Sequence, residues 1–267
     1  MQYKQQIIPD GKKLFYVWFD AMHTRVDVAI VAPAAKDDLV GFSTLLQNEI
    51  RKYEQIGNRF DPKSELSQVN ENAFDSEVKL SPELYAILAA CKEFKLLTNG
   101  YFDISVYSKS GLKSDDKVFL LNEEQQTIRF THDAVLLDLS GFLKGYVLNR
   151  LIEMADNAGF EDFIINLGNS SVYAKGNHPV GTGWKVQLQG AETEVVLQNE
   201  CLTTSGNSDT TRWPLMNPKN GIIVKNKMPA SVVTRDAALG EVLAKVGYLA
   251  TETDKESVFQ KFDAKII

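Results

Sequence analysis

Alternating apolar and polar positions predict two strands near the start of the chain. The stretches 14–20 and 24–31 are rich in β-branched and aromatic residues, and in the second the apolar positions from Val26 to Ile30 fall on one face. A short link, 21–23, joins them. The sequence therefore places a pair of half-buried strands at this end.

Four later segments carry apolar residues at the three- and four-residue spacing of a helix with one buried face. In the second of them Ser81 is a capping residue, Pro82 takes the first helical position, and Gly100 ends the helix. The predicted helices are 37–55, the segment from Pro82 to Gly100, the segment from Lys144 to Gly159, and 236–249.

The second half of the chain contains more predicted strands than helices. This pattern favours an α+β fold with mixed or antiparallel sheets and packed helices over a regular alternation of strand and helix. We expect a single domain over 1–267, with two intimately packed α+β subdomains as the alternative. The predicted strands are 127–131, 134–138, 162–167, 172–175, 184–188, 195–202, 222–224 and 230–233, followed by a helix-strand tail at 258–267; turns or loops are predicted at 58–66, 111–126 and 207–220.

Composition narrows the range of partners. Hydrophobic residues make up 44% and charged residues 24%, as is usual for a globular protein, and the net charge is -6. A negative chain is a poor match for nucleic acid or an anionic membrane, which need a basic face. We see no secretion signal and no apolar run long enough to span a membrane, so we expect a cytoplasmic location, with an exported native form as the alternative.

Cysteine and histidine do not suggest a metal site. Cys91 and Cys201 are expected to be buried free thiols, although the sequence leaves a disulfide open. Two cysteines and three histidines form no spacing that is typical of zinc ligands.

The segment 137–146 combines features that suit an anionic ligand. It follows the apolar run 134–137 and precedes a helix, with Asp138 at its start and Lys144 where the helix begins. Backbone N–H groups at a helix start and a nearby lysine favour a group such as phosphate. We predict that both side chains face one cleft. The alternative is an ordinary loop with a solvated lysine, because the motif lacks a full phosphate-loop pattern.

Several short segments follow one another in a specific order: 21–24, 60–66, 100–103, 138–145, 166–168, 204–206 and 217–221. In this order they resemble the ApbE family, the FAD:protein FMN transferases, over roughly residues 15–250. The resemblance implies an ApbE-like fold and a reaction in which, with Mg²⁺, the FMN half of FAD moves to a Ser or Thr hydroxyl of a target protein and AMP leaves.

The resemblance also implies positions for the ligands. Gly141 would occupy a metal-ligand position, where only its backbone carbonyl can serve. For Met22 and Phe60 the alternative is core packing, and for Asp103 a local turn hydrogen bond. The residues implied to border FAD are Met22, Phe60 (where the family usually has Tyr), Tyr101, Phe102, Asp103, Asp138, Lys144 and Leu215.

The chain departs from the family pattern at the metal site. The family has Asp with Thr four residues later, both facing the metal; a register anchored at 246–247 places Gly240 and Ala244 there, with Leu243 at an additional ligand position. None of these offers a side-chain oxygen, and the adjacent Glu241 lies about 100° around a helix. The family's His-x-x-Asp-Pro motif is also altered, at 214–218.

We therefore expect a degenerate Mg²⁺ site and impaired transfer, unless the register is misplaced. Restoring the pattern with Gly240→Asp and Ala244→Thr is expected to improve Mg²⁺-dependent turnover of FAD. The alternative is a non-catalytic relative that binds flavin or acts as a scaffold, and a third hypothesis is hydrolysis of FAD to FMN and AMP, which needs the same metal. The sequence leaves the acceptor protein, the oligomeric state and the presence of bound FAD open.

Overall fold

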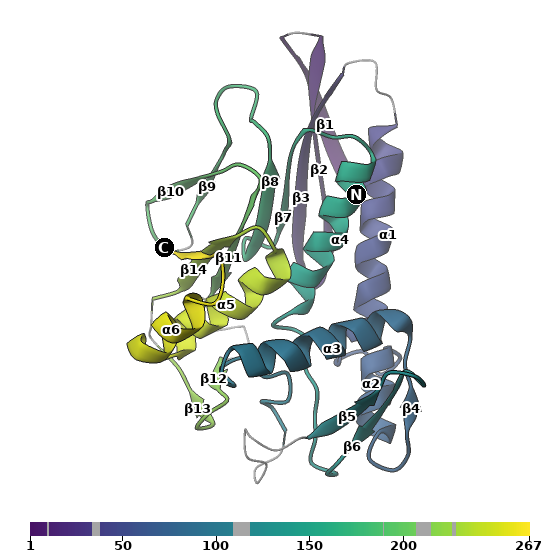
Figure 1. Ribbon diagram of the computed structural model, residues 1–267. Coiled ribbons are helices and arrows are strands. Elements are labelled where there is room, and N and C mark those ends of the chain that lie inside the picture. Colours follow the sequence, from purple (N-terminus) through teal and green to yellow (C-terminus); the bar gives the residue numbers. More distant parts are fainter. Residues whose placement is uncertain (10, 34–37, 109–117, 189, 207–214, 226–227) are drawn as a thin grey trace.

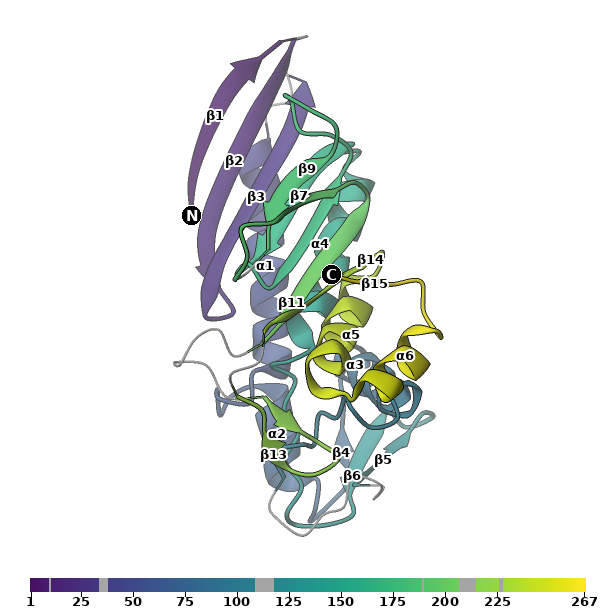
Figure 2. The same cartoon turned by 90° about the vertical axis from the view of Figure 1, so that its left-hand side faces the viewer.

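The computed structural model describes residues 1–9, 11–33, 38–108, 118–188, 190–206, 215–225 and 228–267. Within these residues eight strands form one sheet in which every neighbouring pair is antiparallel (Figure 2). In spatial order its strands are β1 (Gln2–Ile8), β2 (Lys12–Ala21), β3 (Thr24–Pro33), β7 (Asp162–Leu167), β8 (Ser171–Lys175), β11 (Glu200–Ser205), β14 (Ala230–Thr234) and β15 (Lys265–Ile266).

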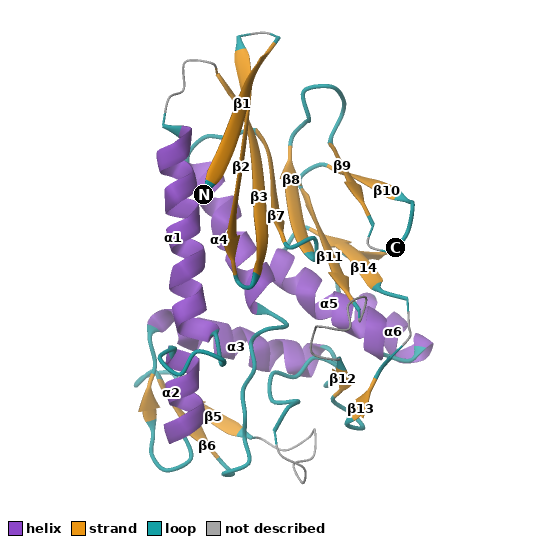
Figure 3. Cartoon of the chain, turned by 180° about the vertical axis from the view of Figure 1, so that it is seen from behind, coloured by secondary structure: helices purple, strands orange, loops and turns teal. Residues whose placement is uncertain are grey.

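Three helices cover one face of this sheet, as Figures 1 and 3 show from opposite sides. They are α1 (Leu39–Gly57), which contacts β2, α4 (Leu143–Asn157), which contacts β7 and β8, and α5 (Ala237–Leu249), which contacts β11 and β14. Nearly every residue of α5 is buried, because this helix lies between the sheet, α4 and α6 (Glu252–Phe259). The apolar faces of β2 and β3 supply the sheet side of the core.

A smaller group of elements lies at one end of α1 (Figure 1). It contains α2 (Glu65–Asn72), α3 (Pro82–Leu97) and a three-stranded sheet of β4 (Val78–Lys79), β6 (Thr127–Phe130) and β5 (Phe119–Asn122). One cluster of buried apolar side chains continues from Phe15 of the large sheet to Ile128 of the small one. Division into one domain or two packed subdomains stays a prediction. Two hairpins complete the described elements, β9 (Trp184–Gln187) with β10 (Glu194–Leu197) and β12 (Met216–Asn217) with β13 (Ile222–Ile223).

The predicted α+β class with antiparallel sheets is confirmed. The α3 helix starts as expected, with Ser81 accepting a hydrogen bond from Leu84 N at 3.1 Å and Pro82 in the first turn. The first helix is capped by Asp38, whose side chain accepts from Gly41 N at 3.0 Å, while the predicted start at Asp37 lies outside the described residues. None of the described helices is both long and apolar enough to cross a bilayer.

The strand predicted at 134–138 is wrong. Within the described residues this segment pairs with no strand. Leu136 N donates to Ser108 Oγ in a loop at 3.0 Å, and Leu137 N donates to Asn70 Oδ1 on α2 at 2.8 Å. Apolar composition alone does not distinguish these two ways of satisfying a buried backbone.

Several other elements of the structure were not predicted from the sequence. The α2 helix begins inside the predicted turn 58–66, where Ser64 caps it through Ser67 N at 3.1 Å. Strand β1 lies at the sheet edge and is almost fully exposed, so it lacks an apolar face to signal it. The predicted loops 111–126 and 207–220 each contain a strand, and their parts 111–117 and 207–214 lie outside the described residues.

Candidate functional site

A cavity of about 730 Å³ lies where the large sheet, α5 and the loop after α3 meet. Its walls come from the β2–β3 turn, the end of α1, the loop 101–107, the turn before α4 and the segments 204–206 and 215–218. All side chains implied to border FAD line this one cavity: Met22, Phe60, Tyr101, Phe102, Asp103, Asp138, Lys144 and Leu215. Segments far apart in sequence therefore converge on one space, while the contacts of these residues with FAD stay a prediction.

Asp138 is held by an arginine that sequence reasoning missed. Arg59 Nε lies 2.7 Å from Asp138 Oδ2, and the two side chains are only 12% and 7% exposed. The other carboxylate oxygen accepts from Ser140 N at 2.7 Å. The Arg59 guanidinium also stacks on Phe60, 4.1 Å from the ring centroid. Asp138 therefore fixes the turn before α4 and the position of Arg59. The sequence feature that could have pointed to Arg59 is its position directly before Phe60.

Lys144 lies in the first turn of α4 and is half-buried. Its Nζ donates to Ser170 Oγ, in the turn between β7 and β8. The alternative of a solvated lysine in an ordinary loop is therefore excluded. Lys144 and Asp138 line the same cavity.

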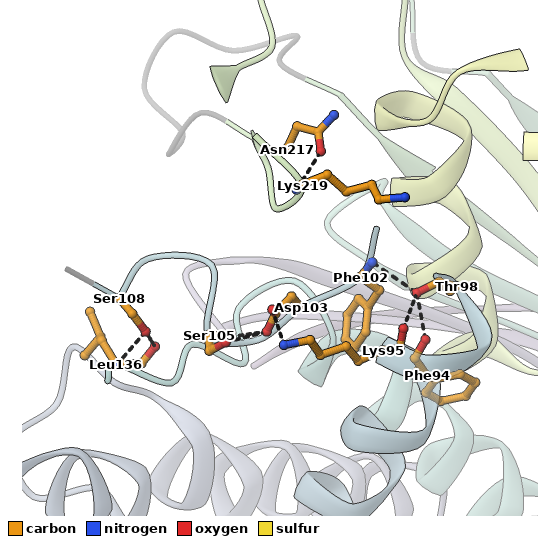
Figure 4. A network of polar contacts seen from close by, with 10 residues as sticks. All are labelled: Phe94, Lys95, Thr98, Phe102, Asp103, Ser105, Ser108, Leu136, Asn217 and Lys219. Atoms are coloured by element: carbon orange, nitrogen blue, oxygen red, sulfur yellow. Dashed lines mark hydrogen bonds and ion pairs between the residues drawn. The ribbon is translucent and has the colours of Figure 1, made fainter. Parts of the chain in front are cut away.

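The loop after α3 is organised around Asp103, as Figure 4 shows. Its Oδ2 lies 2.8 Å from Lys95 Nζ, and its Oδ1 accepts from Ser105 N at 2.8 Å and from Ser105 Oγ at 2.6 Å. Phe102 N donates to Thr98 Oγ1 at 3.1 Å. The local-turn role that was the alternative for Asp103 is thus present, and both of its oxygens are engaged.

The aromatic pair beside Asp103 is well packed. Tyr101 donates from its hydroxyl to Asp254 Oδ2 at 2.6 Å, and Lys219 Nζ lies 4.7 Å from its ring centroid. Burial and this hydrogen bond raise the pKa of Tyr101, and the same hydrogen bond lowers the pKa of Asp254. Phe102 packs at 5.7 Å against the ring of Phe142. Both aromatic residues offer rigid walls to the cavity.

Met22 and Phe60 both line the cavity, Met22 from the turn between β2 and β3 and Phe60 from the segment after α1. Met22 has a φ of 50°, in a two-residue turn between β2 and β3, and its N–H donates to the carboxylate of Glu54. Part of Met22 packs against the core. Phe60 is 50% exposed, so core packing does not account for it. Glu54, which also lines the cavity, had no signal in the sequence beyond its place on α1.

Gly240, Leu243 and Ala244, the positions that the sequence register placed at the metal, lie on a packed face of α5. None of the three lines the cavity. Leu243 and Ala244 are fully buried in an apolar cluster, and a Cβ on Gly240 would lie 2.5 Å from Thr203 Oγ1. An aspartate at Gly240 therefore does not fit without displacing Thr203, and the restoring variant expected from the sequence is aimed at the wrong face of α5.

The residues of α5 that do line the cavity are Glu241, Lys245 and Leu249, one helical turn apart. Lys245 Nζ lies 3.0 Å from Glu241 Oε2 and 3.2 Å from the Glu241 carbonyl oxygen. Glu241 Oε1 accepts from Ser171 Oγ at 2.5 Å. The side chains of Glu241 and Lys245 are 5% and 11% exposed, so this is a buried ion pair.

The same ion pair lies against the turn before α4. A Cβ on Gly141 would lie 2.5 Å from Lys245 Cε and 3.3 Å from Lys245 Nζ. Gly145, one turn later, approaches α5 so closely that its Cβ would lie 2.2 Å from the Ala237 carbonyl oxygen. The two glycines therefore allow α4 and α5 to meet, and the lysine passes over Gly141.

These residues do not fit a magnesium ion. Mg²⁺ prefers oxygen ligands in octahedral geometry. Here both oxygens of Glu241 already accept hydrogen bonds, and the side chain beside the Gly141 position ends in an ammonium group. Among the described residues no three His, Cys, Asp or Glu side chains come together in a group that could hold a metal ion.

Comparison with known proteins gives a consistent result. The sequence pattern of the ApbE family matches residues 22–266. A protein of Chlamydia trachomatis named FAD:protein FMN transferase is 24% identical over 224 residues, covering 72% of this chain and 70% of the relative. A protein of the same name from Chlamydia muridarum is 24% identical over 236 residues, covering 76% and 73%.

Solved structures share the fold. The flavin transferase ApbE from Vibrio cholerae superimposes with a TM-score of 0.81 at 14% identity, covering 99% of this chain and 93% of the other. The apo flavinyl transferase ApbE of Pseudomonas stutzeri gives a TM-score of 0.82 at 13% identity, covering 97% and 92%. The predicted ApbE-like fold is confirmed.

Proposed function

Because this chain belongs to the ApbE family, we propose that it binds FAD in the cavity beside the turn 138–144 and transfers FMN to a protein hydroxyl only weakly. The acceptor would be a Ser or Thr side chain of another protein, and AMP would be the leaving group. The curated relatives named FAD:protein FMN transferase support this reaction class. The observation that carries the proposal is the convergence of every implied FAD-bordering side chain on one cavity.

The size and lining of the cavity suit a dinucleotide. A volume of about 730 Å³ is in the range of ligand pockets, which are mostly apolar with a few placed polar groups. The aromatic rings of Phe60, Tyr101 and Phe102 offer flat surfaces, and burial raises the pKa of the neighbouring Tyr107, which stays a neutral wall. In this arrangement the flavin ring would stack on apolar walls.

The phosphates would lie at the start of α4. Among the described residues no side chain caps this helix, so the positive end of its dipole is available to an anion. Lys144 in its first turn would donate a charge-assisted hydrogen bond to a phosphate oxygen, in competition with its bond to Ser170. Asp138 and Arg59 would hold the turn in place.

Impaired transfer follows from the charge of the site. Attack on phosphorus needs positive charge aimed at the oxygens where negative charge develops. Glu241 and Lys245 form a neutral pair at the place where the cavity meets Gly141. A neutral pair stabilises such developing charge less than a bound cation would. We therefore expect a flavin-binding protein with slow or absent transfer.

Two measurements on the purified protein test this proposal. Titration with FAD, followed by quenching of flavin fluorescence, is expected to show saturable binding. Incubation with FAD, Mg²⁺ and a Ser/Thr-containing acceptor is expected to release little AMP. Absence of FAD binding would overturn the assignment of the cavity. Rapid, metal-dependent AMP release would overturn the impairment while leaving the family reaction in place.

A further inference from the structure

We propose that Lys245 replaces a divalent cation in this cavity: its ammonium group binds the pyrophosphate of the ligand directly, so that FAD binding needs no metal. This inference rests on the proposed function, because it concerns the same site. It adds a residue that the family resemblance did not imply. It also predicts that FAD binds without Mg²⁺, whereas the family resemblance implies that Mg²⁺ takes part.

The Lys245 side chain lies between α5 and the turn before α4. Lys245 projects from α5 into the cavity and crosses Gly141, where a Cβ would lie 2.5 Å from Lys245 Cε. The backbone carbonyl of Gly141 is the group that the resemblance implied as a metal ligand. An ammonium at this place excludes a cation by repulsion and by occupying the space. Lys144, in the next turn, lines the same wall of the cavity.

The ammonium group of Lys245 is held in place by Glu241. In the described part of the chain, Lys245 Nζ donates to Glu241 Oε2 at 3.0 Å and to the Glu241 carbonyl oxygen at 3.2 Å. An ammonium group has three donors, so one remains for a ligand. Glu241 is itself fixed by Ser171 Oγ at 2.5 Å. The lysine is therefore oriented before a ligand arrives, which reduces the entropy lost on binding.

Burying the ion pair of Glu241 and Lys245 has a cost in desolvation. The Glu241 and Lys245 side chains are 5% and 11% exposed, on a helix whose neighbouring residues Leu243, Ala244 and Val246 belong to a buried apolar cluster. Buried ion pairs are weak contributors to stability, since desolvation offsets the attraction. Two charged residues one turn apart at the edge of a cavity are better explained by a ligand than by folding. A phosphate group is the chemical class that suits a lysine on a cavity wall.

The decisive experiment compares FAD binding with and without metal. Fluorescence quenching titrations of the wild-type protein are run in EDTA and in excess Mg²⁺, and the same dissociation constant is expected in both. Lys245→Met keeps the length of the side chain but removes the charge. It is expected to weaken FAD binding roughly tenfold or more, since hydrogen bonds to charged groups are the stronger ones.

Two controls separate loss of charge from loss of structure. Riboflavin has no phosphate, so its affinity is expected to be the same in wild type and Lys245→Met. Lys52→Met removes an exposed lysine that pairs with Glu83 outside the cavity, and no change in FAD affinity is expected. Lys245→Thr places side-chain oxygen atoms that can coordinate Mg²⁺ at both positions 241 and 245. FAD binding by this variant is expected to become stronger when Mg²⁺ is added.

The outcomes distinguish this inference from the proposed function. If wild-type protein binds FAD only with Mg²⁺, the role of Lys245 is refuted and FAD binding stands. If wild type binds no FAD under either condition, both are refuted. If a thermal unfolding scan shows that Lys245→Met does not fold, the FAD affinities of the wild type in EDTA and in Mg²⁺ still decide whether binding requires the metal. Equal loss of riboflavin and FAD binding in a folded Lys245→Met would also refute the inference.

Discussion

The ion pair between Arg59 and Asp138 offers the sharpest test of how the cavity wall is held. We expect Arg59→Met and Asp138→Asn each to lower the free energy of unfolding by about 3–5 kcal/mol, because each leaves a buried charge without its partner. The side chains are 12% and 7% exposed and 2.7 Å apart, so solvent screens them little. Arg59→Met also loses stacking on Phe60, which contributes about 0.5–1 kcal/mol.

The double variant Arg59→Met/Asp138→Asn removes both charges, so it is expected to cost clearly less than the sum of the single changes. A double-mutant cycle is expected to give a coupling energy above about 1.5 kcal/mol. Urea unfolding followed by the fluorescence of the three tryptophans measures each free energy. The matched control is Lys52 with Glu83, which are 2.6 Å apart but 46% and 33% exposed; their coupling is expected to stay below about 1 kcal/mol.

Single changes at Arg59 and Asp138 that add within about 0.5 kcal/mol would refute this reasoning. Such additivity would mean that water reaches the pair, or that the two side chains do not stay together. Equal coupling in the buried pair and in the Lys52–Glu83 pair would likewise show that burial does not set the strength of the interaction.

Three further predictions concern the ligand, the helix contact and the thiols. Lys144→Ala is expected to weaken FAD binding by about 1.5–3 kcal/mol in the fluorescence titration, and unchanged affinity would count against its role. Gly145→Ala is expected to lower the free energy of unfolding by about 1–3 kcal/mol or more, because the new methyl group meets the Ala237 carbonyl oxygen at 2.2 Å; Gly181→Ala, which meets nothing within 4 Å, is the control in the same urea assay. Burial raises the pKa of the Cys91 and Cys201 thiols, so the folded protein keeps protons that the unfolded chain releases. The free energy of unfolding is therefore expected to fall as pH rises above about 8.5, the pKa of a free thiol. In a Cys91→Ala/Cys201→Ala variant this fall is expected to be less steep between roughly pH 8 and 10. The same steepness in the variant and the wild type would show that the two thiols do not cause the fall.

The sequence by itself determined much of the architecture. Alternation predicted β2 and β3, the cap at Ser81 marked the start of α3, and helical spacing predicted α5. These signals are local, because a cap or a half-buried strand involves residues close together in the chain. The resemblance likewise named the side chains that tertiary structure gathers around one cavity.

Contacts between distant segments were decided by tertiary structure alone. No local pattern pairs Arg59 with Asp138, or directs the backbone of 136–137 to Asn70 and Ser108 rather than to a strand. Such choices depend on which polar groups the fold brings within hydrogen-bonding distance.

The rotation of α5 about its own axis is the clearest feature that the sequence alone does not determine. Hydrophobic periodicity sets the rotation of a helix only when one face is polar, and almost every residue of α5 is buried. The sequence therefore left the register of this helix open, and a shift of one residue rotates the expected face by about 100°. Packing of α5 between the sheet and α4 turns Gly240 toward Thr203 and brings Glu241 and Lys245 to the cavity. Lys245 therefore lies beside Gly141, the position that the resemblance had implied as a metal ligand.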